Sequence, residues 1–253
     1  MIKLTPPMGW NSWNTFGENI NEKMIFETAD VMAESGLCDK GYEYLVIDDC
    51  WSLRERDENG RLVPDPEKFP HGMKAVADYV HSKGLKFGMY SCAGNMTCAG
   101  YPGSYEHEFV DAETFASWDV DFLKYDYCYH SPILHGKYLY RRMGLALENC
   151  GRDILFSACS WGADETHEWI KETGASMWRS TGDIFDTWDS VKDLVAQQEK
   201  LHPYNGVGCF NDMDMLIVGM HGKGNVGLAG CSDVQYQTHY APVSYTHLRA
   251  HET

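Results

Sequence analysis

The chain lacks the patterns that mark membrane, metal-binding and nucleotide-binding proteins. Within its 253 residues, no apolar run reaches the ~18 residues that a membrane span needs. Its nine cysteines include no CxxC pair and its eleven histidines form no HxH or HExxH pattern, so the usual zinc-ligand spacings are absent. A GxSxG elbow and a Walker-type glycine loop are also absent. We therefore expect a site without a metal or a cofactor.

Basic residues are scarce. The chain has 21 Lys and Arg against 37 Asp and Glu, a net charge of −16. This balance argues against nucleic acid or an anionic membrane surface as a partner. The first seven residues lack the apolar core of a signal peptide, which favours a cytoplasmic protein. A secreted parent with a signal further upstream remains compatible with the sequence.

Carboxylates are abundant where they are least expected, at the ends of short hydrophobic runs. A buried carboxylate costs free energy unless it is paired or hydrogen-bonded, so core strands gain nothing from ending this way. Parallel α/β barrels, in contrast, build their active sites from the carboxyl ends of the strands. The four runs are 44–49, 120–126, 177–183 and 209–214.

Strand-like and helix-like patterns alternate along the chain, which predicts right-handed parallel crossovers. The strands are expected at 8–16 (with the outgoing loop), 44–48, 85–90, 122–126, 154–159, 177–180 and 207–210. The helices located by periodicity are 22–35, capped by Asn21, 71–83, closed by Gly84, 138–149, 164–172 and 188–201. The predicted fold class is α/β, a (β/α)8 TIM barrel.

Only about forty residues follow the seventh strand, and they contain no apolar run for an eighth. A helix is expected to start near 232–241. Residues 242–253 resemble read-through from a sequencing adapter. We therefore expect residues 1–241 to form an incomplete TIM-barrel catalytic domain, truncated after strand seven, and residues 242–253 to be a non-native tail. Unpaired edges on strands one and seven would invite self-association as a homo-oligomer.

Lys124 and Asp126 are two residues apart on one predicted strand, so both side chains point into the barrel. A nearby ammonium favours the ionised carboxylate that a nucleophile needs. Asp183, four residues after Arg179, is expected to face Asp126 across the barrel mouth. Two opposed carboxylates are the machinery of glycoside hydrolysis. Since Arg179 would lower the pKa of Asp183, we expect burial beside Asp126 to raise it again and Arg179 to bind the sugar.

Three other interpretations of these residues stay open. Lys124 and Asp126 could be a buried structural ion pair. The adjacent Asp48 and Asp49 could both bind sugar hydroxyls where the strand ends and its pleat breaks. A lectin-like binding module would not need Asp126 and Asp183 to oppose each other, so full function after Asp126→Asn would be its signature.

Seven segments together resemble the alpha-galactosidase (melibiase) family, glycoside hydrolase family 27. The resemblance runs in order from about residue 5 to about residue 240, and the ordered set is far more specific than any single motif. The segments are Thr5-Pro-Pro-Met-Gly-Trp-Asn-Ser-Trp13, Tyr44-Leu-Val-Ile-Asp-Asp-Cys-Trp51, Phe69-Pro-His-Gly72, Gly94-Asn-Met-Thr-Cys-Ala-Gly-Tyr-Pro-Gly103, Lys124-Tyr-Asp126, Trp178-Arg-Ser-Thr-Gly-Asp183 and Asn211-Asp-Met-Asp-Met215.

The resemblance implies a retaining enzyme that cleaves terminal alpha-linked galactose-type sugars without a cofactor. By position, Asp126 matches the family's nucleophile and Asp183 its acid/base. Cys98 and Cys128 match a pair that is disulfide-bonded in many relatives. The family's C-terminal β-sandwich has no counterpart here. The positions that match sugar-binding residues are Trp13, Asp48, Asp49, Tyr90, Cys98, Lys124, Arg179, Asp214 and Met215.

The loop after strand five departs from the galactose-preferring pattern. Such relatives commonly carry Glu after the strand-five Cys and a bulky residue three positions further on, whereas this chain has Ser160 and Ala163. Relatives acting on alpha-N-acetylgalactosamine carry the same small pair, which leaves room for an acetamido group. Alpha-galactoside hydrolysis is the default expectation, with alpha-N-acetylgalactosaminide as the alternative substrate. A further alternative is a truncated, catalytically weak sugar-binding fragment.

Overall fold

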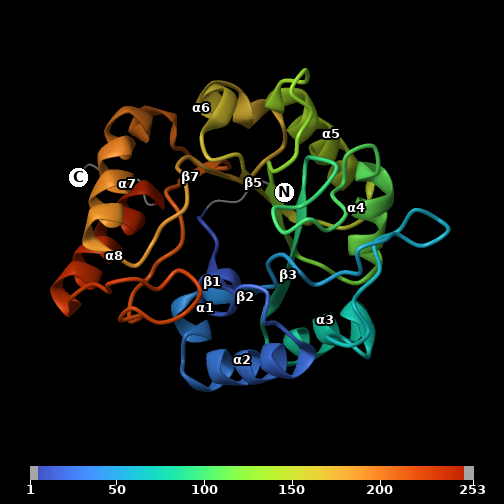
Figure 1. The fold of residues 1–253 in the computed structure, drawn as a ribbon, viewed down its shortest axis with the longest axis horizontal. Coiled ribbons are helices and arrows are strands. Elements are labelled where there is room, and N and C mark those ends of the chain that lie inside the picture. Colours follow the sequence, from blue (N-terminus) through green and yellow to red (C-terminus); the bar gives the residue numbers. More distant parts are fainter. Residues whose placement is uncertain (1–4, 248–253) are drawn as a thin grey trace.

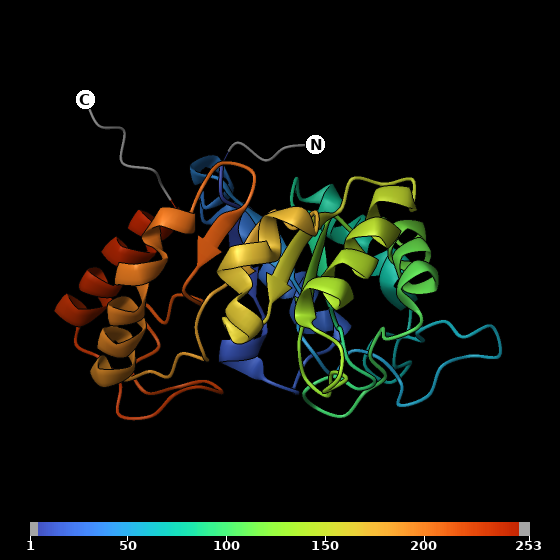
Figure 2. The same cartoon turned by 90° about the horizontal axis from the view of Figure 1, so that it is seen from above.

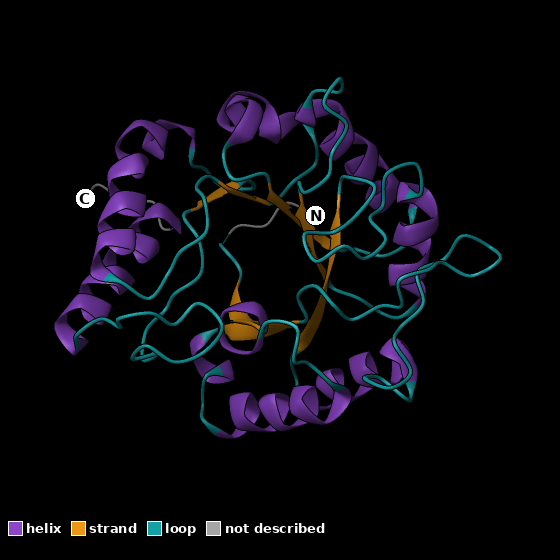
Figure 3. Ribbon diagram, viewed as in Figure 1, coloured by secondary structure: helices purple, strands orange, loops and turns teal. Residues whose placement is uncertain are grey.

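Seven parallel strands form one curled sheet in the order β1-β2-β3-β4-β5-β6-β7 (Figure 3). The computed structural model describes residues 5–247, and the side chains of residues 5–243. The strands are β1 Met8–Asn11, β2 Tyr42–Val46, β3 Lys86–Cys92, β4 Phe122–Asp126, β5 Leu155–Cys159, β6 Met177–Arg179 and β7 Phe210–Asp212. Every pairing is parallel and joins strands that are consecutive in the chain, which confirms the predicted α/β class and barrel-type winding.

Helices surround the sheet on its outer side (Figures 1 and 2). They are α2 Glu22–Glu34, α3 Gly72–Ser82, α4 Glu108–Ser117, α5 Gly136–Asn149, α6 Thr166–Trp169, α7 Trp188–Leu201 and α8 Asp233–His247. The short α1, Trp13–Phe16, follows β1 at the carboxyl end of the sheet, where Asn14 and Thr15 line the cavity. Asn21 caps α2 by accepting a hydrogen bond from the Met24 amide, as its sequence position predicts. Among the described residues, no helix is both long and apolar enough to span a bilayer.

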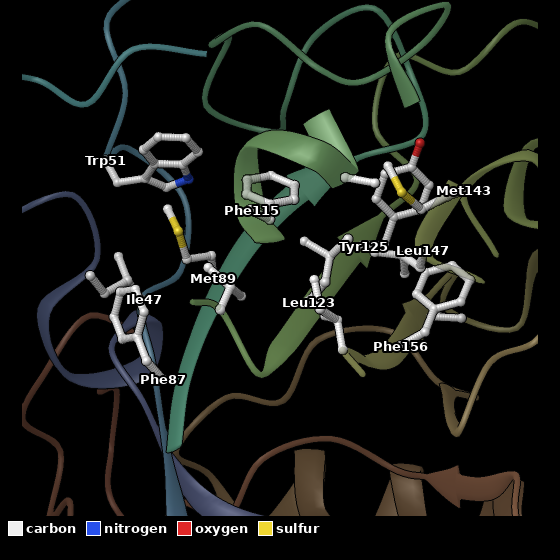
Figure 4. Close-up of a cluster of buried hydrophobic side chains, with 14 of the residues drawn as sticks. Ile47, Trp51, Phe87, Met89, Phe115, Leu123, Tyr125, Met143, Leu147 and Phe156 are labelled. Carbon is white, nitrogen blue, oxygen red and sulfur yellow. The ribbon is translucent and has the colours of Figure 1, made fainter. Parts of the chain in front are cut away.

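Alternation along each strand divides the side chains between the lumen and the helices. On β4, Phe122 and Lys124 line the lumen, whereas Leu123 and Tyr125 belong to the main core between sheet and helices. Figure 4 shows this core, where Tyr125 and Phe156 pack near Met143. The helices thereby fix the sheet from outside and leave its inner face free to carry polar groups.

The sheet does not close within the described residues, because β1 and β7 are not hydrogen-bonded to each other. A cavity of about 420 Å³ fills the lumen. At the carboxyl edge, the amides of Asn225 and Val226 donate to the carbonyl of Asn14 and so connect the loop after β7 to α1. At the opposite edge, the hydroxyls of Tyr42 and Tyr240 lie 3.2 Å apart. The curled sheet therefore has the arrangement of an incomplete barrel.

The predicted tail, residues 242–253, lies only partly within the described structure. Residues 242–247 continue α8, with Pro242 inside the helix, and residues 248–253 lie outside the described residues. The assignment of this segment as non-native stays a prediction.

Three local expectations were wrong. Periodicity did not locate α4 at all. The helix expected over 164–172 is a short α6 flanked by 3₁₀ turns, because Asp164 and Glu165 adopt left-handed φ angles of 53° and 54°. The seventh strand begins at Phe210 instead of residue 207, since the Cys209 amide turns back to the Gly206 carbonyl.

Candidate active site

Asp126 is the last residue of β4, and its carboxylate is fixed on both oxygens. The Tyr90 hydroxyl donates to Oδ2 at 3.0 Å and the Tyr127 amide donates to Oδ1 at 2.9 Å. The residue is 6% exposed. Burial raises the pKa of Asp126, while the charge of Lys124 and the two hydrogen bonds oppose that shift. The result is a carboxylate that is oriented but only partly hydrated.

Lys124 enters the same site from two residues earlier, as the spacing predicts. Its ammonium lies 2.7 Å from Oδ2 of Asp48 and is largely buried. Burial alone would lower the pKa of Lys124, but the negative charges of Asp48 and Asp126 outweigh it and raise the pKa. Lys124 is therefore a permanent cation between the ends of β2 and β4.

Asp48 and Asp49 diverge at the end of β2, and both are only 2% exposed. Asp48 accepts a hydrogen bond from Asn11 Nδ2 at 2.8 Å in addition to Lys124. Asp49 turns away, where the amides of Cys50 and Ala99 donate to it at 2.7 and 3.0 Å. Burial raises the pKa of Asp49. In this structure Asp48 therefore faces the charged site, whereas Asp49 anchors the loop after β3.

Cys98 and Cys128 form a disulfide, as the resemblance implies, with their Cα atoms 5.1 Å apart. It joins the loop after β3 to the segment directly after β4. The two sulfurs and an Asp126 carboxylate oxygen lie within 4.8 Å of one another. Since the sulfurs are bonded to each other, they are not free thiolates that could coordinate a metal.

Arg179, the last residue of β6, gathers two carboxylates. Its Nη2 lies 2.9 Å from Asp183 Oδ1 and 2.9 Å from Asp214 Oδ2. Its Nη1 lies 3.8 Å from the Cys159 sulfur. Burial raises the pKa of Asp214 to about 6, against the opposing charge of Arg179. This cluster forms the second polar side of the lumen, across β5 from Asp126.

The expected burial of Asp183 was wrong. Its side chain is 66% exposed, whereas that of Arg179 is 5% exposed. Asp183 lies four residues beyond the end of β6, on a loop that reaches solvent, so the barrel wall does not enclose it. Its ion pair with Arg179 is the contact that orients it.

The loop after β5 carries Ser160 and Ala163. The Ser160 hydroxyl is fully buried and lies 2.5 Å from the Thr166 hydroxyl, so in this structure it faces α6 and not the cavity. Ala163 is partly exposed. Trp161 has a left-handed φ of 58°, and Gly162 has φ +81°, where an added Cβ would lie 2.5 Å from the Ser180 carbonyl oxygen. Such backbone strain is common at functional loops.

The remaining candidates occupy the ends of β1 and β7. Met215 lines the cavity beside Asp214. Trp13 is half-buried, and its amide is held by Asn11 Oδ1 at 2.9 Å. Sequence reasoning missed Asn11, which joins Trp13 to Asp48. The signal that could have identified Asn11 was its position at the end of the first strand, within the Thr5–Trp13 segment.

Together these features define a class. A curled parallel sheet carries two separated groups of carboxylates at its carboxyl end, each held by a buried cation. This arrangement belongs to the α/β-barrel glycoside hydrolases, whose chemistry rests on two carboxyl groups.

The chain belongs to the alpha-galactosidase (melibiase) family. The alpha galactosidase A family matches residues 5–229. The alpha-galactosidase of Cyamopsis tetragonoloba is 50% identical over 238 residues, covering 94% of this chain and 56% of the relative. Alpha-galactosidase A of Cellvibrio japonicus is 51% identical over 229 residues, covering 86% and 56%. The solved alpha-galactosidase of Saccharomyces cerevisiae is 38% identical, with a TM-score of 0.85, covering 94% of this chain and 56% of that one.

The chain thus spans about half the length of the curated relatives it matches. The matched half is the one that carries the curled sheet and the candidate site. Family membership and fold follow from these matches, whereas the activity of this chain is a separate question.

Proposed function

We propose that the chain hydrolyses terminal alpha-linked galactose by a double displacement that retains the anomeric configuration. The observation that carries the proposal is the placement of Asp126, a buried carboxylate oriented by Tyr90 and Tyr127 beside the cation of Lys124. A structural ion pair alone would need no such orientation, since Lys124 already pairs with Asp48. The relatives from Cyamopsis tetragonoloba and Cellvibrio japonicus are alpha-galactosidases, which supports galactose as the sugar.

Asp126 would attack the anomeric carbon and form a glycosyl–enzyme ester as the aglycone leaves. The charge of Lys124 opposes the effect of burial on the pKa of Asp126, which favours the ionised nucleophile. Asp48, held by Lys124 and Asn11, presents an acceptor suited to a sugar hydroxyl.

Asp183 would protonate the leaving oxygen and later activate water. Its exposure suits both steps, because the aglycone departs toward solvent and the water arrives from it. Arg179 orients the carboxyl group from one side. The proton that Asp183 gives to the leaving oxygen is recovered when Asp183 deprotonates the water that attacks the glycosyl ester.

Alpha-N-acetylgalactosaminide is the second candidate substrate, and one observation favours it. Ser160 and Ala163 are small, and the Ser160 hydroxyl is turned toward Thr166. Position 160 therefore offers no carboxylate to the 2-position of the sugar. An acetamido group would be accommodated more readily than in a site with Glu at that position.

The test is hydrolysis of p-nitrophenyl alpha-galactoside and alpha-N-acetylgalactosaminide, with Asp126→Ala as the blank. Turnover of the galactoside that the blank abolishes would support the proposal. A higher kcat/KM on the acetamido sugar would replace galactose by N-acetylgalactosamine. Binding of galactose without turnover of either glycoside would favour a weak sugar-binding fragment.

A further inference from the structure

The end of β7 holds an acidic residue that the proposed mechanism does not use. Asp212 lines the same cavity as Arg179 and Asp214. Its Oδ1 accepts a hydrogen bond from the Asp214 amide at 2.8 Å. A side chain that binds the backbone two residues ahead fixes the path of the chain as it leaves the strand. Asp212 therefore controls how the chain reaches Asp214.

The backbone of Asp214 is in a conformation that needs such control. Its φ of +93° lies in the region that favours glycine, where other residues pay a steric cost. Its two carboxylate oxygens nevertheless accept hydrogen bonds from the amides of Met215 and Ile184, each at 2.7 Å. All three contacts are made with the backbone in this conformation, and the Asp212 contact is the one made to the Asp214 amide itself.

The position of Asp214 affects Asp183 through Arg179, which pairs with both carboxylates. Oδ2 of Asp214 lies 2.9 Å from Arg179 Nη2, and the same Nη2 lies 2.9 Å from Asp183 Oδ1. Arg179 Nε is buried without a hydrogen-bond partner in the described structure. Among the described residues, Asp214 and Asp183 are the oxygen acceptors paired with this guanidinium. Its Nη1 makes a long contact with the Cys159 sulfur, and the charge of Asp212 also acts on it.

We propose that Asp212 is a positioning residue for the acid/base: its side chain holds Asp214 in the left-handed turn, which keeps Arg179, and through it Asp183, in place. The inference rests on the proposed function of Asp183. The step it adds is that a residue at the end of β7 sets the orientation of the acid/base through Asp214 and Arg179.

Three variants of Asp212 and one control separate positioning from mere stability. Asp212→Asn keeps an oxygen that can accept the Asp214 amide, whereas Asp212→Ala removes it and Asp212→Glu displaces it. Thr187→Ala removes the cap of α7, where Thr187 accepts from the Ser190 amide, and leaves the four acidic and basic groups untouched. It is the control for a general loss of stability.

We expect Asp212→Ala and Asp212→Glu to lower kcat/KM on the preferred aryl glycoside by about 10–100-fold, because a displacement of about 1 Å costs up to ~10²-fold. Asp212→Asn should stay within about threefold at pH 7, and Thr187→Ala should be unchanged. Equal losses for Asn and Ala, or a loss in the control that matches its drop in melting temperature, would overturn the proposal.

The pH profile gives a second readout that a structural role would not move. The groups facing Asp214 are the charges of Arg179 on β6, Asp212 on β7 and Asp183 on the loop between them, and the neutral Cys159 thiol on β5. The negative charge of Asp212 raises the pKa of Asp214. Asp212→Asn should therefore move the acid limb of kcat/KM to lower pH and keep its plateau, whereas Asp212→Ala should lower the plateau as well. A plateau lowered equally in both variants would overturn the assignment.

A crystal structure of Asp212→Ala tests the proposal without an activity measurement. It should show Asp214 outside the left-handed region and its carboxylate away from Arg179. An unchanged Arg179–Asp214 contact would overturn the positioning role even in an inactive chain. Calorimetric titration of the unsubstituted chain with galactose distinguishes a failure of the proposed function from a failure of the positioning role. Absence of both galactose binding and turnover would refute the proposed function alone.

Discussion

The two sides of the candidate site are built in opposite ways. The nucleophile side consists of Asp48, Lys124 and Asp126 at the ends of β2 and β4. The two carboxylates are buried, Lys124 is largely buried between them, and Tyr90 holds Asp126. The acid/base side consists of Arg179, Asp183 and Asp214. There, Asp183 is 66% exposed on a loop and Asp214 depends on a strained backbone.

The two sides are positioned by different structural means. On the nucleophile side, the register of the sheet sets the positions, since Cys92, Asp126 and Cys159 are aligned across β3, β4 and β5. The Cys98–Cys128 disulfide adds a covalent link between the loop after β3 and the segment after β4. On the acid/base side, a series of side-chain contacts sets the positions. Changing the register of a sheet would break many backbone hydrogen bonds, whereas losing one side-chain contact in a series can displace every group beyond it. Substitutions should therefore separate the two sides.

The largest effect is expected at the nucleophile side, from Asp126→Asn. The amide keeps the shape and can still accept the Tyr127 hydrogen bond, but it cannot form the glycosyl ester. We expect kcat on p-nitrophenyl alpha-galactoside to fall by on the order of 10⁴-fold or more, with little change in melting temperature. Asp193→Asn, at an exposed position on α7, is the matched control. Full activity in Asp126→Asn would instead indicate a binding module.

The corresponding change on the other side, Asp183→Asn, should cost less and depend on the substrate. General acid–base catalysis contributes about 10²–10⁴-fold. Since p-nitrophenolate leaves with little protonation, we expect the smaller loss on the aryl glycoside and the larger one on a galactosyl disaccharide. The two substrates are compared by kcat/KM. Identical losses on both would argue that Asp183 binds the sugar and does not transfer a proton.

Removing the Cys98–Cys128 disulfide should make the nucleophile side less rigid and so reduce the difference between the two sides of the site. The bridge closes a loop of 30 residues, for which chain entropy predicts about 3–4 kcal/mol of stabilisation. We expect Cys98→Ser with Cys128→Ser to lose that amount in urea unfolding. Activity should fall as well, because Ala99, next to Cys98, donates to Asp49.

Cys38→Ser is the control for the disulfide variant, since Cys38 is a partly buried free thiol. A loss of stability no larger than that of the control would mean that the sheet register alone holds this side.

The sequence predicted the nucleophile side better than the acid/base side for a physical reason. Strand β4 matches its expected bounds of 122–126, because alternation along a strand is a local property. The two-residue spacing then places Lys124 in the lumen. The exposure of Asp183 depends on the path of a loop, and the clamp of Asp212 on Asp214 depends on a turn that hydrophobic patterning does not specify.

Helix α4 shows the same limit in the fold. Its buried face carries Glu108 and Asp111, both at most 2% exposed. They pair with Arg142 and Arg56, which come from distant segments. These two charged positions interrupt the apolar stripe of Ala112 and Phe115 that periodicity would otherwise detect. The disulfide, likewise, was predicted from family resemblance and not from the spacing of the nine cysteines.

The smallest predicted effect concerns α8, which packs chiefly against β7 and α7 on the acid/base side. Tyr236 on α8 donates to the buried carboxylate of Asp186, and it packs in one cluster with Ile184, whose amide holds Asp214. His239 on the same helix is fully buried, and neither ring nitrogen has a hydrogen-bond partner among the described residues. Burial lowers the pKa of His239 to about 4, although the charge of Asp186 opposes the shift.

The sign of the pH effect follows from the two protonation states of His239. The unfolded histidine takes up its proton near pH 6.5, whereas the folded one does so only near its lowered pKa of about 4. Between these values the unfolded state binds more protons, so stability falls as the pH falls, by up to about 3 kcal/mol. We expect hydrogen-exchange protection of residues 184–187 to drop between pH 7 and pH 5 while that of 122–126 changes less. His239→Leu should remove the difference, because leucine does not titrate. A pH-dependent loss that persists in His239→Leu, or that is equal in both segments, would show that α8 does not distinguish the two sides.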